Sequence, residues 1–384
     1  MHSLDAFAQA KLDDLQRRHL RRALAETARE DGIWIERDGR KLLSFSCNDY
    51  LNLSQNPAVK QAAIAAIEQY GAGSGASRLV TGNHPLYAQL EKRLARIKQT
   101  EAACVFGSGY LANAGILPVL IGRDGLVLAD ELSHACLFAG AQLSRGMLMT
   151  FRHNDVAHAH ELLERHRAAH DHALIVTDGV FSMDGDLAPL GDLLAVANEY
   201  DAWLMSDDAH GLGVVGGGRG SSFTGNTHIP VPLQMGTLSK AVGAYGGYLC
   251  ASAAAIDLVR NRARTLIYST GLPPACVAAS IAALDLIERE PGYAALPVQK
   301  AKTFTRAAGL PEAQSPIVPV VVGGEEAALA ASRLLADEGY LAAAIRPPSV
   351  PAGTSRLRLT FTAQHPDDHV ARLADIIRDK VMAQ

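Results

Sequence analysis

The sequence has few cysteines, and they are not arranged to act together. Its 384 residues contain five, scattered singly at Cys47, Cys104, Cys136, Cys250 and Cys276, with no C-x-x-C pair. An odd number at such spacings fits neither a zinc ribbon nor a disulfide framework. Free thiols in a reducing compartment fit better, so we expect a cytoplasmic protein.

Long hydrophobic runs and a strong net charge are also missing. The first residues, "MHSLDAFAQAKLDDLQRRHLRRALAE", contain no apolar core of a signal peptide, and no run approaches the length of about 20 residues that spans a membrane. A formal net charge of −4 creates no strong field toward nucleic acid or anionic lipid. With 48% hydrophobic and 20% charged residues, the composition is that of a globular protein. We therefore expect neither nucleic acid nor a membrane as a partner.

What the sequence does contain is an alternation of short apolar runs and helical stretches. The apolar runs are "AACVF", "GLVLAD", "HALIVTD", "AWLMSD", "LQMG" and "GGYLCAS". Helical stretches such as "YLANAGILPVL" and "LGDLLAVANEY" separate most of them. Strands that are apolar on both faces and alternate with helices are typical of a largely parallel sheet covered on both sides. We therefore expect an α/β fold.

The two ends of the chain depart from this rhythm. Residues 4–28 have apolar side chains at helical spacing, which predicts an amphipathic helix lying against the body. After about residue 285, "SPIVPVVVG" and "SRLRLTFTA" predict strands of a smaller sheet, with the helix "EEAALAASRLLADEGY" ended by Gly339 between them. The predicted division is an N-terminal helix and segment over 1–45, a large domain over 46–285 and a small α+β domain over 286–384.

Polar side chains follow the apolar runs, at the points where the strands are expected to end. The segments are 107–109, 130–134, 178–184, 207–210 and 237–240, and they are rich in Ser, His, Asp and Lys. Ligands of an open α/β sheet bind beyond the carboxyl ends of its strands. We therefore treat these segments as one candidate site.

One of these segments, "SDDAHGLGVVG" from Ser206 to Gly216, contains the pattern G-x-G-x-x-G. In a dinucleotide-binding fold a helix begins within this pattern, and an acidic residue follows about twenty residues later. Here the chain continues with glycine, serine and proline, and no Asp or Glu occurs between Asp208 and Asp257. The pattern therefore favours a flexible loop over a nucleotide site.

A metal site is a second interpretation of the same segment. Asp207, Asp208 and His210 could ligate a divalent ion together with His134 or His153. No second tight ligand pair accompanies them, because "HELLERH" at 160–166 lacks the spacing of H-E-x-x-H. A metal-binding or non-enzymatic module built on this Asp/His cluster stays open as an alternative.

A third interpretation joins the segments around pyridoxal phosphate, a cofactor with a phosphate, a ring nitrogen, a phenolic oxygen and an aldehyde. "FGSGYLANAG" places Ser108, Gly109 and Tyr110 where a strand becomes a helix, and the free N–H groups of a helix N-terminus bind phosphate. Asp207, directly after a buried strand, can keep the ring nitrogen protonated. Lys240, among small uncharged neighbours in "GTLSKAVGAYGG", can form a Schiff base with the aldehyde. Taken alone, Lys240 could be a surface lysine and Asp207 a turn-forming aspartate. Taken together with the other segments, they favour the cofactor.

Four segments, "TDGVFSMDGDLAPL", "SDDAHGLGVVG", "GTLSKAVGAYGG" and "IRPPSVPAGTSRLRLT", closely resemble the α-oxoamine synthases. "FSCNDYLNLS", "GAGSGASRLVTG", "ADELSHACL" and "LIYSTGLPPA" extend the resemblance, which runs in order from about residue 20 to the C-terminus. The family implies a pyridoxal-phosphate enzyme of fold type I, a large domain with a mostly parallel sheet plus a smaller α+β domain. It also implies an obligate homodimer with shared sites, an acyltransferase that condenses an amino acid with an acyl thioester and releases CO2.

The resemblance implies a role for each residue around the cofactor. Lys240 would form the Schiff base and transfer protons, and Asp207 would face the pyridine nitrogen. His210 would contact the phenolic oxygen, with Ser182 nearby, and His134 would stack on the ring. The phosphate contacts would be Ser108, Gly109, Tyr110 and Thr237, joined by Ser269 and Thr270 from the other subunit.

The resemblance also implies the substrates. The sequence around "RLVTG" and "IRPPSVP" favours L-alanine with pimeloyl-CoA, or with the corresponding carrier-protein thioester, in a reaction that feeds biotin biosynthesis. Arg358 would hold the amino-acid carboxylate, Asn48 would line the substrate pocket, and Arg22, or Arg21, would contact the acyl substrate. A relative that acts on glycine, of the 2-amino-3-ketobutyrate CoA ligase or 5-aminolevulinate synthase type, is the alternative.

Overall fold

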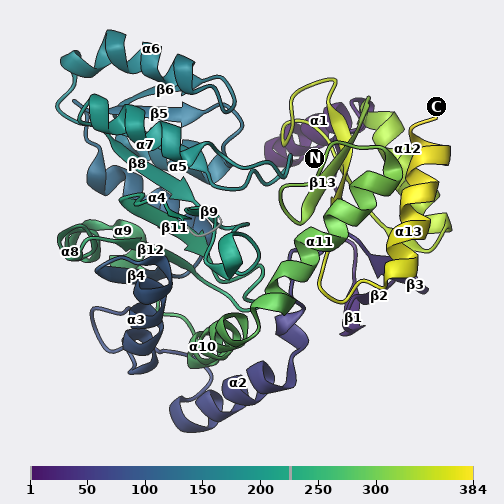
Figure 1. The fold of residues 1–384 in the computed structure, drawn as a ribbon, viewed down its shortest axis with the longest axis horizontal. Coiled ribbons are helices and arrows are strands. Elements are labelled where there is room, and N and C mark those ends of the chain that lie inside the picture. Colours follow the sequence, from purple (N-terminus) through teal and green to yellow (C-terminus); the bar gives the residue numbers. More distant parts are fainter. Residues whose placement is uncertain (1, 225–226, 384) are drawn as a thin grey trace.

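The computed structural model describes residues 2–224 and 227–383, which form a large and a small domain side by side (Figure 1). A seven-stranded sheet with the order β4-β12-β11-β8-β7-β5-β6 forms the centre of the large domain. Its strands are β4 (Ala102–Phe106), β5 (Leu126–Asp130), β6 (Met147–Phe151), β7 (Ala173–Asp178), β8 (Trp203–Asp207), β11 (Leu233–Thr237) and β12 (Gly247–Ala251). Only β12 runs antiparallel to its neighbours, so the predicted, largely parallel α/β sheet is confirmed.

The six apolar runs are all strands of this sheet, and β6 is the strand that sequence patterning missed. Only Phe151 of β6 is fully buried, because the strand lies at the edge of the sheet beside β5. An edge strand needs no continuous apolar run. Its sequence, "MLMTF", is a short and mostly apolar run that was overlooked, and its carboxyl end contributes to the network around His153 described below.

Helices cover both faces of the sheet, as the apolar strands require. In β5, Val127 and Ala129 pack into one core with α4, whereas Leu126 and Leu128 pack into the other with α6 and α7. The helices of this domain are α2 (Pro57–Tyr70), α3 (Leu86–Lys98), α4 (Gly109–Leu120), α5 (Ala135–Ser144), α6 (Val156–His166), α7 (Leu190–Glu199), α8 (Ala253–Arg262), α9 (Arg264–Ile267) and α10 (Pro274–Arg289). A short pair, β9 (Phe223–Thr224) and β10 (Thr227–His228), lies beside the sheet.

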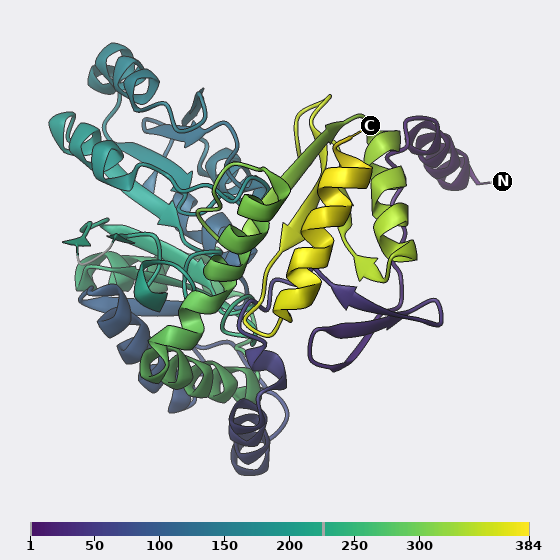
Figure 2. The ribbon, with the colours of Figure 1, turned by 45° about the vertical axis from the view of Figure 1, so that its right-hand side comes forward.

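The small domain takes elements from both ends of the chain (Figure 2). β3 pairs with β14 in parallel, so the N-terminal strands share a four-stranded sheet with the C-terminal part of the chain. Leu43 and Phe45 belong to the same apolar core as Phe304 and Phe361. The predicted segment 1–45 thus contributes strands to the domain predicted over 286–384. The elements are β1 (Ala28–Asp31), β2 (Trp34–Arg37), β3 (Arg40–Ser44), α11 (Pro291–Ala308), β13 (Ile317–Gly323), α12 (Glu325–Asp337), β14 (Tyr340–Leu341), β15 (Ala343–Ile345), β16 (Ser355–Thr360) and α13 (Asp367–Ile376).

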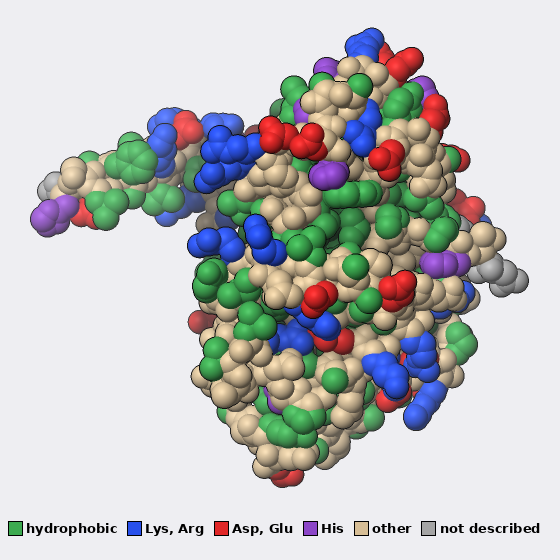
Figure 3. Space-filling model, turned by 90° about the vertical axis from the view of Figure 1, so that its left-hand side faces the viewer, with side chains coloured by type: hydrophobic (Ala, Val, Ile, Leu, Met, Phe, Trp, Pro, Cys, Tyr) green, Lys and Arg blue, Asp and Glu red, His purple; other side chains and the backbone are tan. Residues whose placement is uncertain are grey.

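The N-terminal helix differs from the expectation in two respects. α1 covers only Ser3–Arg17, and none of its residues is buried, so the prediction of a helix over 4–28 lying against the body was wrong. Leu4 and Phe7 are 72% and 64% exposed, because the helix extends away from the body (Figure 3). Helical spacing predicted an apolar face, but spacing cannot say whether the same chain covers that face.

Within residues 2–224 and 227–383, no helix is long and apolar enough to cross a lipid bilayer.

A fully buried ion pair joins α3 to the end of β8. Lys98 Nζ lies 2.7 Å from Asp208 Oδ2 and also donates to the carbonyl of Arg219. Asp208 Oδ1 accepts the backbone N–H of Ser221. A Cβ at Gly211 would lie 1.9 Å from the same Oδ1 atom, so that position has no room for a side chain. The first glycine of the nucleotide-like pattern therefore serves close packing around Asp208.

We expect Lys98→Met to destabilise the protein by about 3–5 kcal/mol, because the variant leaves the carboxylate of Asp208 buried without its cation. Chemical denaturation would measure the loss. The matched control is Lys92→Met on the exposed face of α3, where a change within about 0.5 kcal/mol is expected. Equal stability of the two variants would contradict the structural importance of the pair.

Candidate active site

The carboxyl ends of the parallel strands surround a pocket of about 220 Å³. Eight of the predicted cofactor-site residues line it together: Ser108, Gly109, Tyr110, His134, Asp207, His210, Thr237 and Lys240. A larger, mostly apolar hollow of about 670 Å³ lies where β8 and β11 begin, at the opposite edge of the sheet, and contains none of the predicted site residues. The smaller pocket is therefore the candidate active site.

One wall of this pocket is the N-terminus of α4. The Ser108 hydroxyl caps the helix by accepting the N–H of Leu111 at 3.2 Å. A Cβ at Gly109 would lie 3.2 Å from Met235 and 3.5 Å from Thr237, so glycine keeps this end of the helix open. Exposed N–H groups and the helix dipole favour an anion at such a terminus. The wall therefore fits a phosphate group.

Asp207 lies in the pocket wall with both carboxylate oxygens held by hydrogen bonds. Its Oδ1 atom accepts the N–H of Ala209 at 3.0 Å, and its Oδ2 atom accepts from Asn113 Nδ2 at 2.7 Å. Asn113 also donates to the sulfur of Cys136 at 3.1 Å. Donors that bind a carboxylate stabilise its ionised form and fix its orientation. Asp207 is thus prepared to receive one more donor, which a protonated ring nitrogen would supply.

A chain of hydrogen bonds leads from Lys240 across the pocket. Lys240 Nζ lies 2.7 Å from His210 Nε2, and His210 Nδ1 lies 2.6 Å from the hydroxyl of Tyr50. That hydroxyl reaches Asn48 Oδ1 at 3.4 Å, which also accepts from Arg358 at 3.1 Å. When the ammonium of Lys240 donates to Nε2 of His210, the single proton of the neutral imidazole lies on Nδ1 and points to Tyr50. The chain therefore connects the candidate Schiff-base lysine to the candidate carboxylate-binding arginine.

Burial changes the protonation of the reactive groups. It lowers the pKa of Lys240 to about 8, although the charge of Asp207 opposes this shift. Burial, with the cationic charges of Lys240 and Arg358, also holds the pKa of His210 well below its usual range. A lysine with a pKa near neutrality is partly in its nucleophilic form, and a neutral histidine can accept a proton.

His134 enters from the end of β5 and is held through its backbone. Its N–H donates to Asp178 Oδ1 at 3.0 Å, at the end of β7. Burial and the charge of Asp207 hold the pKa of Asp178 well above its usual range. Burial also lowers the pKa of His134, so its ring favours the neutral form that can stack on an aromatic ligand. Asp178, which also lines the pocket, thus holds the backbone of His134 by a hydrogen bond.

The predicted substrate residues Arg358 and Asn48 meet each other at the hydrogen bond described above. Arg358 also donates from Nε to the backbone carbonyl of Ser182, so Ser182 contacts the arginine through its backbone. Arg358, Asn48 and Ser182 do not line the pocket. Arg22, which is exposed and donates to the hydroxyl of Ser349 at 3.3 Å, does not line it either. Neither do Ser269 and Thr270, whose predicted contacts belong to a second subunit.

Four contributors escaped the sequence analysis: Asn113, Tyr50, Asp178 and Cys136. Asn113 and Tyr50 lie inside the segments "FGSGYLANAG" and "FSCNDYLNLS", but nothing in their spacing relates them to Asp207 or His210. Asp178 begins one of the polar segments that follow strands, which was the available signal. The metal alternative loses one of its candidate ligands, because the carboxylate of Asp208 is paired with Lys98. Over the described ranges, no group of three or more His, Cys, Asp and Glu side chains is placed to hold a metal ion.

Comparisons with known proteins identify the family of this chain. The model of the aminotransferase class I and II family matches residues 40–377. The 8-amino-7-oxononanoate synthase of Methylocella silvestris is 69% identical over 90% of this chain and 99% of its own, and that of Beijerinckia indica is 60% identical over 98% of each. Serine palmitoyltransferase of S. paucimobilis, solved with bound PLP, is 27% identical with a TM-score of 0.90 over 100% of this chain and 99% of its own.

The pKa of Lys240 leads to a test on the protein without bound ligands. Reductive methylation by formaldehyde requires a neutral amine, so modification of Lys240 should reach half its maximal rate near pH 8. Peptide mass spectrometry would follow the rate, with Lys92 on the exposed face of α3 as the internal reference. Parallel pH profiles at the two lysines would contradict the lowered pKa.

Proposed function

Because the chain belongs to the 8-amino-7-oxononanoate synthases, within the class I and II aminotransferase family, we propose that it condenses L-alanine with a pimeloyl thioester. The products would be 8-amino-7-oxononanoate, the free thiol carrier and CO2, as a step of biotin biosynthesis. The chain is an acyltransferase that uses pyridoxal phosphate. The observation that carries the proposed chemistry is that Lys240, Asp207 and the N-terminus of α4 line one pocket.

The residues of the pocket fit this cofactor. The open helix end at Gly109 suits its phosphate, and Lys240 suits its aldehyde. Asp207, whose two oxygens are both held by hydrogen bonds, suits its ring nitrogen. When bound, the cofactor supplies an electron sink for the carbon from which a proton or CO2 departs. The protein supplies orientation, charge and proton transfer.

We assign the proton-transfer work to Lys240 and its hydrogen-bond partner. A lysine with a pKa of about 8 can both accept and return a proton near neutral pH. His210 lies 2.7 Å from Lys240 Nζ and stays neutral, so it can orient the amine without competing for the substrate carboxylate. His134, whose backbone Asp178 anchors, would cover one face of the cofactor ring.

We assign the binding of alanine to Arg358. Its guanidinium already donates to Asn48 Oδ1 and to the carbonyl of Ser182, which fix its plane and leave further donors for a carboxylate. Arg22 as an acyl contact, and Ser269 and Thr270 as contacts to the phosphate of a second subunit, remain part of the proposal. A homodimer in the cytoplasm is proposed with them.

The proposal is tested by offering alanine or glycine with pimeloyl-CoA and with a pimeloyl carrier protein, and by identifying the product by mass. We expect 8-amino-7-oxononanoate from alanine, and at least about tenfold lower kcat/KM with glycine, since one methyl contact is worth about 1–3 kcal/mol. Comparison of the two thioesters identifies the preferred carrier.

Lys240→Ala is the matched control for this assay. It removes the reactive amine, so product formation should be lost while the fold is kept. Preferred use of glycine would replace the proposal by the glycine-using alternative. Product formation at the normal rate by the Lys240→Ala variant would contradict the assignment of the lysine.

A further inference from the structure

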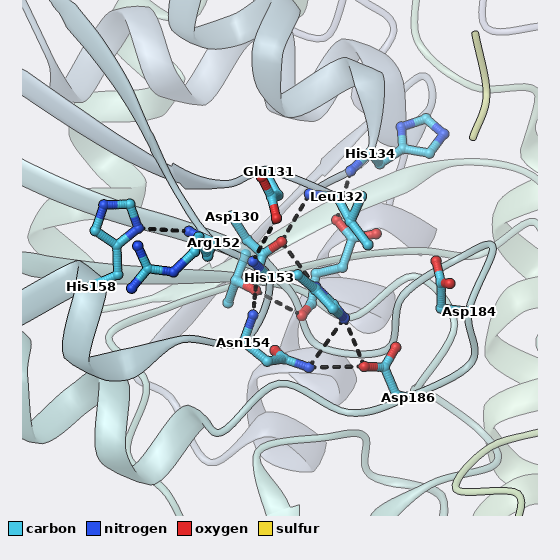
Figure 4. A network of polar contacts seen from close by, with 12 residues as sticks. Asp130, Glu131, Leu132, His134, Arg152, His153, Asn154, His158, Asp184 and Asp186 are labelled. Atoms are coloured by element: carbon cyan, nitrogen blue, oxygen red, sulfur yellow. Dashed lines mark hydrogen bonds and ion pairs between the residues drawn. The ribbon is translucent and has the colours of Figure 1, made fainter. Parts of the chain in front are cut away.

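His153 lies outside the pocket, between two carboxylates from different parts of the large domain (Figure 4). Its Nδ1 atom lies 3.1 Å from Asp130 Oδ1, and its Nε2 atom lies 2.8 Å from Asp186 Oδ2. Asp130 ends β5, His153 follows β6, and Asp186 belongs to the loop of residues 181–187 after β7. A single imidazole ring therefore bridges three segments that end at the same edge of the sheet.

The surroundings of His153 keep the ring charged. Burial alone would lower the pKa of His153, but hydrogen bonds and charges from Asp130 and Asp186 outweigh burial and raise it to about 10. Glu131 accepts the backbone N–H of His153, and the ring packs edge-on against Phe181 with centroids 4.4 Å apart. With both ring nitrogens donating to carboxylates, the imidazolium acts as a two-ended clamp.

One end of the clamp holds the 181–187 loop. Asn154 Nδ2 adds a second donor to Asp186 Oδ2 at 2.8 Å. This loop carries the partners of two arginines of β16: the carbonyl of Ser182 accepts from Arg358, and the carboxylate of Asp184 accepts from Arg356. The position of the loop therefore fixes the guanidinium that we assign to the substrate carboxylate.

The 181–187 loop also contacts the small domain directly. A Cβ at Gly185 would lie 2.1 Å from the carbonyl oxygen of Ile317, and the N–H of Leu187 donates to Gln314. The loop is thus packed between the two domains. Asp186, through His153 and Asn154, holds the side of the loop that faces the large domain.

The other end of the clamp holds the segment that leads to His134. Asp130 Oδ1 accepts the N–H of Leu132 at 2.9 Å as well as contacting His153, and the carbonyl of Asp130 accepts the N–H of Ser133. These bonds shape the turn immediately before His134, the residue expected to cover the cofactor ring. The segment that leads to His134 and the loop that contacts Arg358 therefore both bind His153.

We propose that His153 is a positioning residue that fixes Arg358 relative to His134 by clamping the 181–187 loop to the end of β5. The inference rests on the proposed function, because Arg358 is taken to bind the amino-acid carboxylate. Loss of the clamp removes the ionic part of the loop's attachment to the large domain and leaves the hydrogen bonds of Asn154, so Arg358 is held less firmly relative to His134. The amino acid should then bind less well, whereas the thioester, which does not depend on Arg358, should bind as before.

The experiment compares two variants of the holoenzyme with a control. His153→Gln removes the cation, and Asp186→Asn removes one carboxylate at a partly exposed position, which keeps the test available if the first variant does not fold. Either variant should raise the KM for alanine by about tenfold, the effect of losing one charged positioning contact, and leave the KM for the thioester within about twofold. His166→Gln, at the end of α6 and outside the network, should change neither.

A second readout does not depend on turnover. Folding raises the pKa of His153 from about 6.5 in the unfolded chain to about 10. The charged ring therefore stabilises the protein fully below about pH 6.5, and this stabilisation is lost as the pH rises through about 10. The difference in thermal midpoint between the unaltered protein and His153→Gln should therefore be largest near pH 6 and shrink toward pH 10. His166→Gln, which lies outside the network, serves as the reference variant in the same measurement.

The outcomes separate the two proposals. Unchanged KM for alanine in both variants, or equal increases for alanine and thioester, would overturn the positioning role. A pH-independent difference in thermal midpoint would overturn the charged clamp. If the unaltered protein prefers glycine, the proposed function fails, and the same KM comparison with glycine still decides the role of His153.

Discussion

The buried ion pair between Lys98 and Asp208 determines the direction of the two neighbouring carboxylates at the end of β8. Asp208 faces away from the pocket toward Lys98, and Asp207 faces into it toward Asn113. Successive side chains of a strand point to opposite faces, so fixing one fixes the other. Gly211 leaves the space that this arrangement needs. The carboxylate that we assign to the cofactor ring therefore lies in front of a buried charge pair.

Two connections then join the pocket to the small domain. The first is the hydrogen-bond chain from Lys240 through His210 and Tyr50 to Asn48 and Arg358. The second is the 181–187 loop, which lies between the domains and carries the carbonyl that accepts from Arg358. The residues that we assign to the chemistry and to substrate binding lie on different domains, so their alignment depends on these few polar contacts.

The parallel sheet and the main residues of the pocket were predictable. Apolar runs alternating with helices predicted the strands, and the polar residues after them predicted where Lys240, Asp207, His134 and His210 would meet. These predictions succeeded because strand period and strand ends are local properties. Asn113 and Tyr50 were not predictable, because their role depends on where α4 and the segment after β3 pack. The edge strand β6 was missed, and α1 was predicted to lie against the body although it is exposed. In both cases the burial of the side chains depends on which elements lie beside them.

By itself, the sequence determined the residue types and the family: a lysine among small residues, an aspartate and a histidine three residues apart, and strands apolar on both faces. The tertiary structure decided which polar groups become partners. It joined the N-terminal strands to the C-terminal domain, separated Asp208 from Asp207, and placed His153 between Asp130 and Asp186. Hydrogen bonds and ion pairs act over a few ångströms in space, whatever the distance along the chain, so only the folded chain specifies them.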